Sequence, residues 1–212
     1  EEWKLKPGKV ACIYNGLDIG KIKELANKSV KSETIRNINM YPQICAVGSL
    51  TKQKGYNTLL KAVQRVLQKR KIYLIIVGIG PIESELKKLT KELRIEEYVQ
   101  FMGYIKNPYK YIRNSDLFVH AAFYEGFPNV IIEAMVCGTP VISTRAKYGP
   151  EEIIDNEENG FLVDVGDNEE LADKINSILD GKYFIKSITN NAYKKAKNSY
   201  SHKLMCNKYN NL

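Results

Sequence analysis

Residues 117–143, LFVHAAFYEGFPNVIIEAMVCGTPVIS, contain the signals of a strand, a loop, a helix and a second strand in succession. The apolar run 117–120 predicts a buried strand. A loop over 123–129 follows, and an apolar helical pattern runs from about 129 to 137, where Gly138-Thr139-Pro140 ends it. The run 141–143 predicts the next strand, so the stretch is typical of a parallel βαβ unit.

The same alternation continues on both sides of this unit. Apolar runs predict strands at 10–14, 44–47, 72–77, 99–102 and 159–163, and amphipathic patterns predict helices at about 56–68, 82–93 and 108–114. The pattern predicts an α/β fold, a doubly wound Rossmann-like parallel sheet of about six strands flanked by helices. We expect one domain over 1–212, with its core at about 9–180 and C-terminal helices at about 182–209.

The composition indicates a folded domain without a membrane-spanning segment. Hydrophobic residues make up 44% of the 212 residues, and no apolar run approaches the roughly 20 residues of a membrane span. The cysteines, Cys12, Cys45, Cys137 and Cys206, match no zinc or redox spacing, so we expect buried free thiols in a reducing, cytoplasmic compartment.

The net charge of +8 favours an anionic partner but does not choose between nucleic acid, anionic lipid and a diphosphate ligand. Lysines are spread along the chain, which weighs against a nucleic-acid-binding stripe.

The loop after the predicted strand 117–120 carries the main candidate residues, because ligands of such sheets bind at the carboxyl ends of the strands. Glu125 lies in this loop beside Gly126, which allows close approach of a ligand. Pro128 suits a helix start, where free backbone N–H groups bind anions. Glu133 follows one turn later. Taken singly, Glu125 also fits an ordinary surface loop, and Glu133 also fits a carboxylate stabilised by the helix dipole.

Glu125 and Glu133, with seven residues between them, form an E-x7-E pattern set in EGFPN and EAM. This pattern resembles the motif of the family 4 retaining glycosyltransferases of the GT-B fold, the glycosyl transferases group 1. Other stretches resemble further motifs of the family: NGLD at 15–18, VGSL to KG at 47–55, VGIGP at 77–81, FMGY at 101–104, GTPVI at 138–142 and NGFLV at 159–163. The resemblance covers about 10–180 and implies the C-terminal, donor-binding domain of such an enzyme.

The resemblance also implies the roles of individual residues. Glu125 would bind hydroxyls of the donor sugar, Glu133 would accept hydrogen bonds from the two ribose hydroxyls, and Lys54 would offset the charge on the departing diphosphate. Glu125 and Lys54 are therefore the expected catalytic residues. The full expected donor site is Gly48, Ser49, Lys54, Gly103, Tyr104, Ile105, Glu125, Gly126, Phe127, Asn129, Val130 and Glu133.

Two positions depart from the family pattern. Ser49 stands where the family has an arginine that shares the diphosphate with the lysine, and Ala122 stands where a serine is common. Because a guanidinium is well suited to phosphate, its absence leaves more of this work to Lys54, or to another cation such as Lys52.

The implied activity is transfer of a sugar from a nucleotide-sugar donor, more often a UDP-sugar than a GDP-sugar, to a glycan or lipid-linked acceptor, with retention of configuration. No Asp-x-Asp occurs in the sequence, so we expect no metal and no other cofactor. The N-terminal acceptor domain of the GT-B fold is expected to be missing, so the chain alone would be inactive. Exposed apolar surface is expected around 190–209, where the last helices would meet that domain. A peripheral contact with the inner face of an anionic membrane is a further option.

Two other functions fit parts of the sequence. One is a non-catalytic domain that binds a nucleotide sugar or a partner, for which Ser49 is the best support. The other is a basic nucleic-acid-binding domain. We interpret His120 as a packing residue and His202 as a surface residue.

Overall fold

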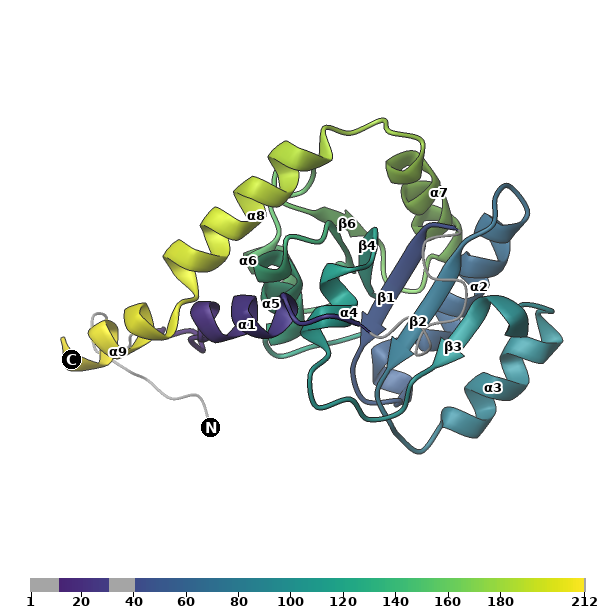
Figure 1. Cartoon of the computed structure of the whole chain (residues 1–212), viewed down its shortest axis with the longest axis horizontal. Helices are drawn as coiled ribbons and strands as arrows, with labels where there is room; N and C mark the ends of the chain where they lie inside the picture. The colour runs from purple at the N-terminus through teal and green to yellow at the C-terminus, as the bar shows by residue number, and fades with distance from the viewer. Residues whose placement is uncertain (1–11, 31–40, 212) are drawn as a thin grey trace, which may run out of the picture.

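In a computed structural model, which describes residues 12–30 and 41–211, six parallel strands form one sheet (Figure 1). The strands are β1 (Gln43–Val47), β2 (Tyr73–Val77), β3 (Val99–Phe101), β4 (Leu117–His120), β5 (Val141–Thr144) and β6 (Phe161–Val163). Their order across the sheet is β3-β2-β1-β4-β5-β6, and each neighbouring pair is parallel. The predicted doubly wound α/β fold is therefore confirmed.

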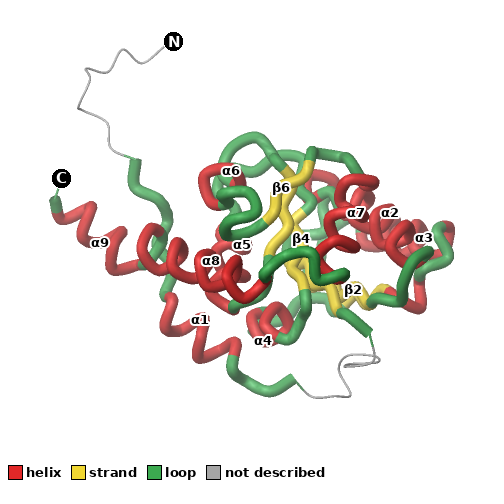
Figure 2. The backbone as a smooth tube through the Cα atoms, turned by 90° about the horizontal axis from the view of Figure 1, so that it is seen from above, coloured by secondary structure: helices red, strands yellow, loops and turns green. Residues whose placement is uncertain are grey.

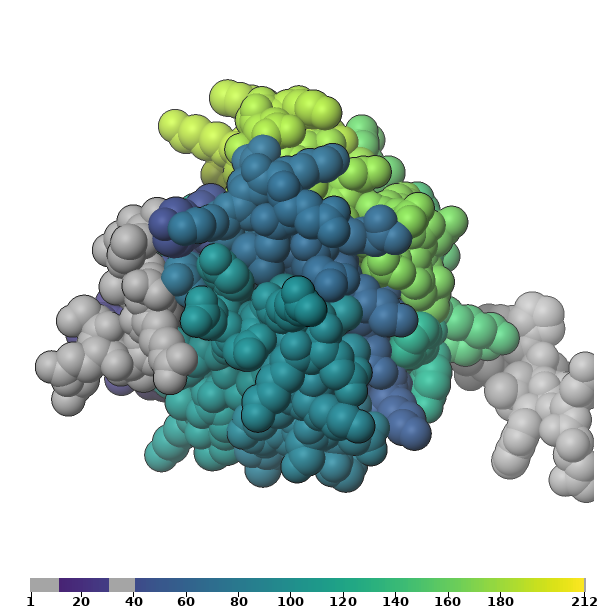
Figure 3. Space-filling model, turned by 90° about the vertical axis from the view of Figure 1, so that its right-hand side faces the viewer, coloured from purple at the N-terminus to yellow at the C-terminus, as the bar shows by residue number. Residues whose placement is uncertain are grey.

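Helices cover both faces of the sheet, as Figure 2 shows. One layer contains α2 (Tyr56–Leu67), α3 (Glu83–Glu92) and α7 (Asn168–Leu179), and the other contains α1 (Ile19–Ala26), α4 (Tyr109–Arg113), α5 (Asn129–Cys137) and most of α8 (Ile185–Ser199). Figure 3 looks onto α2 and α3 of the first layer. Each layer packs its apolar side chains against one face of the strands, which makes two hydrophobic cores with the sheet between them.

The winding direction changes between β1 and β4. The helix after β1 is α2, in the first layer, whereas the helix after β4 is α5, in the second. The loops that follow these two neighbouring strands therefore separate at the carboxyl edge of the sheet. In doubly wound folds this switch point is where ligands bind.

The N-terminal segment differs from the prediction. Residues 10 and 11 of the predicted strand lie outside the described residues, and 12–14 form no strand. Leu17 instead forms a bridge with Ser201, and its N–H donates to the Tyr200 carbonyl at 2.8 Å. The segment around Leu17 thus lies beside the junction of α8 and α9 (His202–Asn210), to one side of the sheet in Figure 1.

The cysteines only partly match the expectation. Cys45 and Cys137 are buried free thiols, but Cys12 is exposed and Cys206 is half-buried. Burial raises the pKa of the Cys137 thiol to about 12, so this group is inert. The expectation of two buried thiols near the chain ends was wrong because these segments pack loosely on the core.

The tail differs from the expectation in one respect. Ala192 and Ala196 of α8 are buried against the core, so the expected apolar surface around 190–209 is confined to α9, where Tyr209 is 59% exposed. The short helix α6 (Pro150–Ile153) and the 3-10 turns Lys52–Lys54 and Glu96–Tyr98 complete the described elements. None of the helices in the described ranges has the length and apolarity needed to cross a bilayer.

Candidate functional site

The loop after β1 places Lys54 at the switch point. The 3-10 turn Lys52–Lys54 ends at Gly55, whose φ of +64° is left-handed. A Cβ at Gly55 would lie 1.9 Å from the carbonyl oxygen of Ala121, so only glycine allows this approach of the two loops. The lysine is thereby held against the loop that follows β4.

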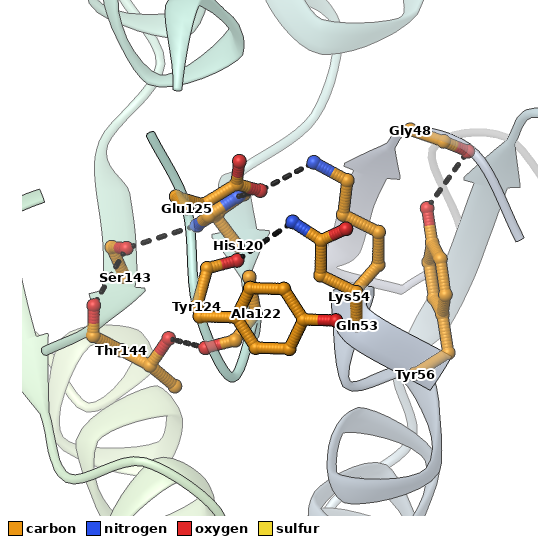
Figure 4. Close-up of polar contacts among 10 residues, drawn as sticks. All are labelled: Gly48, Gln53, Lys54, Tyr56, His120, Ala122, Tyr124, Glu125, Ser143 and Thr144. Carbon is orange, nitrogen blue, oxygen red and sulfur yellow. Dashed lines mark hydrogen bonds and ion pairs between the residues drawn. The ribbon is translucent and has the colours of Figure 1, made fainter. Parts of the chain in front are cut away.

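Hydrogen bonds to backbone carbonyls join the β4 loop to the β1 loop. The N–H of Phe123 donates to the Gln53 carbonyl at 2.8 Å, and the Gln53 side-chain amide donates to the Tyr124 carbonyl at 2.9 Å. On the other side, the Thr144 hydroxyl donates to the Ala122 carbonyl at 2.5 Å. The loop that carries Glu125 is thus held by contacts on both sides (Figure 4).

Lys54 and Glu125 form an ion pair at this point (Figure 4). The side chain of Lys54 is 22% exposed and that of Glu125 is 9% exposed, so the pair is largely removed from water. Nε2 of His120 lies 3.0 Å from the same carboxylate oxygen, Oε1. Because a carboxylate only accepts, we assign a proton to Nε2. Both contacts use Oε1, which leaves Oε2 available to a ligand.

His120 is in turn held by Ser143, whose hydroxyl oxygen lies 3.1 Å from Nδ1 of the ring. The imidazole is 4% exposed and stands at the carboxyl end of β4, beside β5. Burial opposes ionisation of Glu125, but the hydrogen bonds from His120 and Lys54 outweigh it and lower the pKa of the carboxyl group. Glu125 is therefore a carboxylate at neutral pH and accepts hydrogen bonds rather than supplying a proton.

A hollow of about 310 Å³ lies beside the pair, at the carboxyl ends of β1 and β2. Its lining is mainly apolar: Val47, Gly48, Ser49, Val77, Gly78, Ile79, Tyr104, Ile105 and Pro108. A Cβ at Gly78 would lie 1.9 Å from the Gly48 carbonyl oxygen, so glycine brings the two loops together here as well. Such a cavity suits a flat, largely apolar group with polar atoms at its rim.

Glu133 lies near this hollow rather than in contact with the ion pair. It is half-buried on α5, and its Oε1 lies 3.4 Å from the hydroxyl of Tyr109, the residue after the lining Pro108. Burial raises the pKa of Glu133, and the Tyr109 hydrogen bond only partly opposes this. No hydrogen bond or ion pair of the described chain joins Glu133 to Glu125 or Lys54.

The remaining predicted residues fall around the same edge of the sheet. Ser49 and Tyr104 are exposed at the rim of the hollow, and Gly103, with a φ of +66°, turns the chain toward it. Open space surrounds Gly126 where a Cβ would stand.

The start of α5 differs in detail from the prediction. Pro128 is the cap residue, so the first helical residue is Asn129, whose N–H is already bonded to the Phe127 carbonyl at 3.0 Å. The Asn129 Oδ1 atom is buried without a partner among the described residues, and Val130 follows it. The ring of Phe127 stacks on Tyr14 at 5.1 Å, so only the backbone of Phe127 remains for a ligand.

Sequence reasoning missed His120, Ser143 and Tyr109 as parts of the site. His120 is buried, as expected of a packing residue, but its hydrogen bond to Glu125 makes it more than that. The signal was its position as the last residue of a buried strand, at the edge where ligands bind. His202 is exposed, as expected. Among the residues that the structure describes, no three His, Cys, Asp or Glu side chains form a cluster suited to a metal ion.

The chain matches the family model for "Glycosyl transferases group 1" over residues 28–195. It is 32% identical over 197 residues to the N-acetylgalactosamine-N,N'-diacetylbacillosaminyl-diphospho-undecaprenol 4-alpha-N-acetylgalactosaminyltransferase of Campylobacter jejuni, covering 93% of this chain and 52% of that protein. It is 35% identical over 138 residues to the lipopolysaccharide core biosynthesis glycosyltransferase LpsE of Rhizobium meliloti, covering 65% and 39%. The chain thus spans about half the length of such relatives, or less.

Solved structures share the fold. The Anabaena protein Alr3699/HepE, in complex with UDP and glucose, superposes with a TM-score of 0.82 at 26% identity, covering 94% of this chain and 55% of that one. A glycosyltransferase from Rickettsia africae superposes with a TM-score of 0.85 at 25% identity, covering 100% of this chain and 58% of that one.

Proposed function

We propose that this chain binds the nucleotide-sugar donor of a retaining sugar transfer. The chain belongs to the family of glycosyl transferases group 1 and has the fold of one GT-B domain, which supports this proposal. The observation that carries the proposal is the Lys54–Glu125 pair at the switch point of the sheet, beside an apolar hollow. The pair supplies one cation for a phosphate and one carboxylate for sugar hydroxyls.

The hollow would receive the base, with Gly103, Tyr104 and Ile105 beside it. UDP in the similar Anabaena structure supports a uridine nucleotide as the first candidate. Glu133 would accept hydrogen bonds from the ribose hydroxyls, because it lies near the hollow. Its carboxylate contacts the hydroxyl of Tyr109, and Tyr109 follows Pro108, which lines the hollow. The unpartnered Asn129 Oδ1 and the backbone of 126–130 would face the phosphates or the sugar.

Lys54 and Glu125 would act on opposite charges of the transition state. As the bond between the sugar carbon and the phosphate oxygen breaks, positive charge develops on the sugar and negative charge on the phosphate. Lys54 would stabilise the departing phosphate, and Glu125 would hold a sugar hydroxyl through Oε2. His120, which bonds to Oε1, would fix the orientation of that carboxylate.

Retention of configuration would follow if the acceptor attacks from the side that the phosphate leaves. The acceptor oxygen then bonds to the sugar carbon, and its proton passes to a phosphate oxygen of the leaving group. No protein nucleophile is needed for this path. Lys54 provides a fixed positive charge, so we propose that the transfer needs no divalent ion, as the absence of Asp-x-Asp from the sequence suggests.

The acceptor would bind largely to an N-terminal domain of the same enzyme, and we propose that the 212-residue chain alone transfers no sugar. The Campylobacter relative is named for a diphospho-undecaprenol acceptor and the Rhizobium relative for lipopolysaccharide core biosynthesis. A glycan or lipid-linked acceptor, used at the cytoplasmic side of a membrane, is the class that these names favour.

A thermal-shift panel of UDP, GDP, ADP and their sugars tests the donor proposal. At a ligand concentration near 100 times Kd, binding adds about 2.7 kcal/mol, which raises the Tm of a domain of this size by roughly 5–10 °C. Lys54→Met keeps the apolar stem but removes the charge, and should abolish most of the shift. Lys61→Met, on the outer side of α2, is the matched control. If no nucleotide raises the Tm, the proposed function is wrong; a shift with GDP alone would refute only the uridine preference.

A non-catalytic binding domain is the second candidate, because Ser49 stands exposed at the rim of the hollow where the family carries an arginine. Donor hydrolysis by the full-length protein distinguishes the two, since only a transferase turns the donor over.

A further inference from the structure

The net positive charge of the chain is concentrated at its C-terminal end. Residues 182–212 contain seven of the 32 basic residues and none of the 24 acidic ones. The preceding residues therefore carry 25 basic and 24 acidic side chains, a balance of only +1. Although lysines occur along the whole chain, the excess of +8 is almost entirely a property of the C-terminal helices.

Within α8 the lysines gather on the outer face of the helix. Ile188, Ala192 and Ala196 are buried and define the inner face. Lys186, Lys194 and Lys197 are exposed, and at 3.6 residues per turn they fall within about 80° of the circumference, directed away from the inner face. They extend over roughly 16 Å of the helix axis. We call this set of three lysines the α8 basic face.

The α8 basic face has no counter-charge within the described chain. None of its three ammonium groups forms an ion pair with another described residue. Lys195, on the opposite flank of α8, is instead paired with Asp155 at 2.7 Å. On the near flank, the exposed Lys23 of α1 lies over the ring of Tyr193 at 4.7 Å and adds a further positive charge.

We propose that the α8 basic face docks on the surface of an anionic lipid bilayer. Lysines on the convex outer side of a helix can reach a flat, negatively charged surface together, and each gains attraction from it. Ser187 and Asn190, which lie between them, are small enough to allow that approach. Phe184, 76% exposed just before the helix, can enter the headgroup region. Nucleic acid is the less suitable partner, because the lysines offer no row of free rings for successive bases: the ring of Tyr193 is covered by Lys23, and Phe184 is a single exposed ring.

This placement would bring the donor site close to the membrane. α8 is followed directly by Tyr200, whose ring lies 5.5 Å from that of Phe127, in the loop that also carries Glu125. The basic face therefore runs along the side of the molecule up to the edge of the sheet where the candidate site lies. The inference goes beyond the proposed function, and its test needs no nucleotide, no acceptor and no catalysis.

Cosedimentation of the 212-residue chain with vesicles tests the proposal. The vesicles contain 30 mol% phosphatidylglycerol in phosphatidylcholine, at 0.1 M ionic strength, and pure phosphatidylcholine vesicles serve as the neutral reference. Each lysine near an anionic surface contributes about a fivefold factor in partitioning. The triple variant Lys186→Gln, Lys194→Gln and Lys197→Gln should therefore bind roughly 100-fold more weakly. The substitutions are exposed, and an unchanged circular dichroism spectrum verifies the fold.

The matched control removes the same number of charges from the other helical layer. Lys61→Gln, Lys88→Gln and Lys91→Gln alter exposed lysines of α2 and α3. This variant should keep vesicle binding within about threefold of the original, because its lysines face away from the docked surface. The proposal is overturned if both variants lose binding equally, if the original chain binds neutral vesicles as well as anionic ones, or if it binds duplex DNA and no vesicles.

Discussion

Replacing Glu125 by glutamine removes the negative charge that holds Lys54 in the free protein, and it should change the affinities for nucleotide and nucleotide sugar by unequal amounts. A nucleoside diphosphate must draw Lys54 away from Glu125 or share it, and it must also tolerate the nearby carboxylate. Free UDP should therefore bind Glu125→Gln more tightly than it binds the original protein. A UDP-sugar should lose part of that gain, because its hydroxyls no longer meet a charged acceptor.

The size of the effect follows from the burial of the pair. Exposed ion pairs contribute about 0–1 kcal/mol and the loss of one partner from a fully buried pair costs about 3–5 kcal/mol. With Lys54 22% and Glu125 9% exposed, we take about 1–2 kcal/mol for the contact. UDP affinity should then rise roughly 5- to 30-fold. A hydrogen bond to a charged group contributes about 1–1.5 kcal/mol more than one to the neutral amide oxygen of glutamine, so the preference for UDP-sugar over UDP should fall roughly 5- to 10-fold.

Isothermal titration calorimetry measures both affinities, with the UDP-sugar that gives the largest thermal shift. Glu85→Gln, which changes an exposed carboxylate of α3, is the control and should leave both values unchanged. Lys54→Met should weaken UDP and UDP-sugar alike. The assigned roles are refuted if Glu125→Gln weakens UDP as much as Lys54→Met does, or if the ratio of the two affinities does not change.

Three further predictions concern single residues of the site. Burial raises the pKa of Glu133, so ionisation of this group reduces the stability of the fold as the pH rises from the ordinary glutamate pKa to the raised one. Glu133→Gln should therefore raise the Tm at pH 7 but not at pH 3. The same variant should bind UDP about tenfold more weakly in calorimetry. An equal Tm gain at both pH values would contradict this. Gly55→Ala should cost more than about 3 kcal/mol in urea unfolding, because its Cβ meets the Ala121 carbonyl, whereas Gly103→Ala, also left-handed but in open space, should cost about 1 kcal/mol. Equal costs would show that the loops do not need this contact. His120→Leu should lower the free energy of unfolding by about 1–3 kcal/mol in the same assay. His120→Gln keeps a hydrogen-bond donor for Glu125 and should recover part of that stability. If it recovers none, His120 acts only as a packing residue.

The sheet could be read from the sequence because each strand is a short apolar run between turn residues. Runs such as Leu117–His120 and Tyr73–Val77 are buried on both faces, and burial on both faces is what makes a strand uniformly apolar. The segment at 10–14 has the same composition, yet residues 12–14 form no strand. Its aromatic residue, Tyr14, packs on Phe127 and Tyr200 instead, a choice that local sequence does not determine.

The approach of Lys54 and Glu125 agrees with the sequence analysis, because the family resemblance assigned both to one donor site and both follow predicted strands of a parallel sheet. The part played by His120 was not predicted. A histidine at the end of an apolar strand fits a packing role equally well, and only the register of β4 beside β5 brings Ser143 to its other nitrogen. Hydrogen bonds of this kind depend on which residues face one another across strands, and a single sequence does not give that register.

The bridge between Leu17 and Ser201 sets how the domain can be joined to another body. The polypeptide enters beside Leu17 and its last helix departs after Ser201, so anything attached at either end is tethered at a single corner of the molecule. At that corner the rings of Tyr14 and Tyr200 pack on Phe127, which belongs to the loop that carries Glu125, so a body attached there would be in mechanical contact with that loop. Bringing an acceptor to the donor sugar and holding the donor in position would then be mechanically coupled tasks.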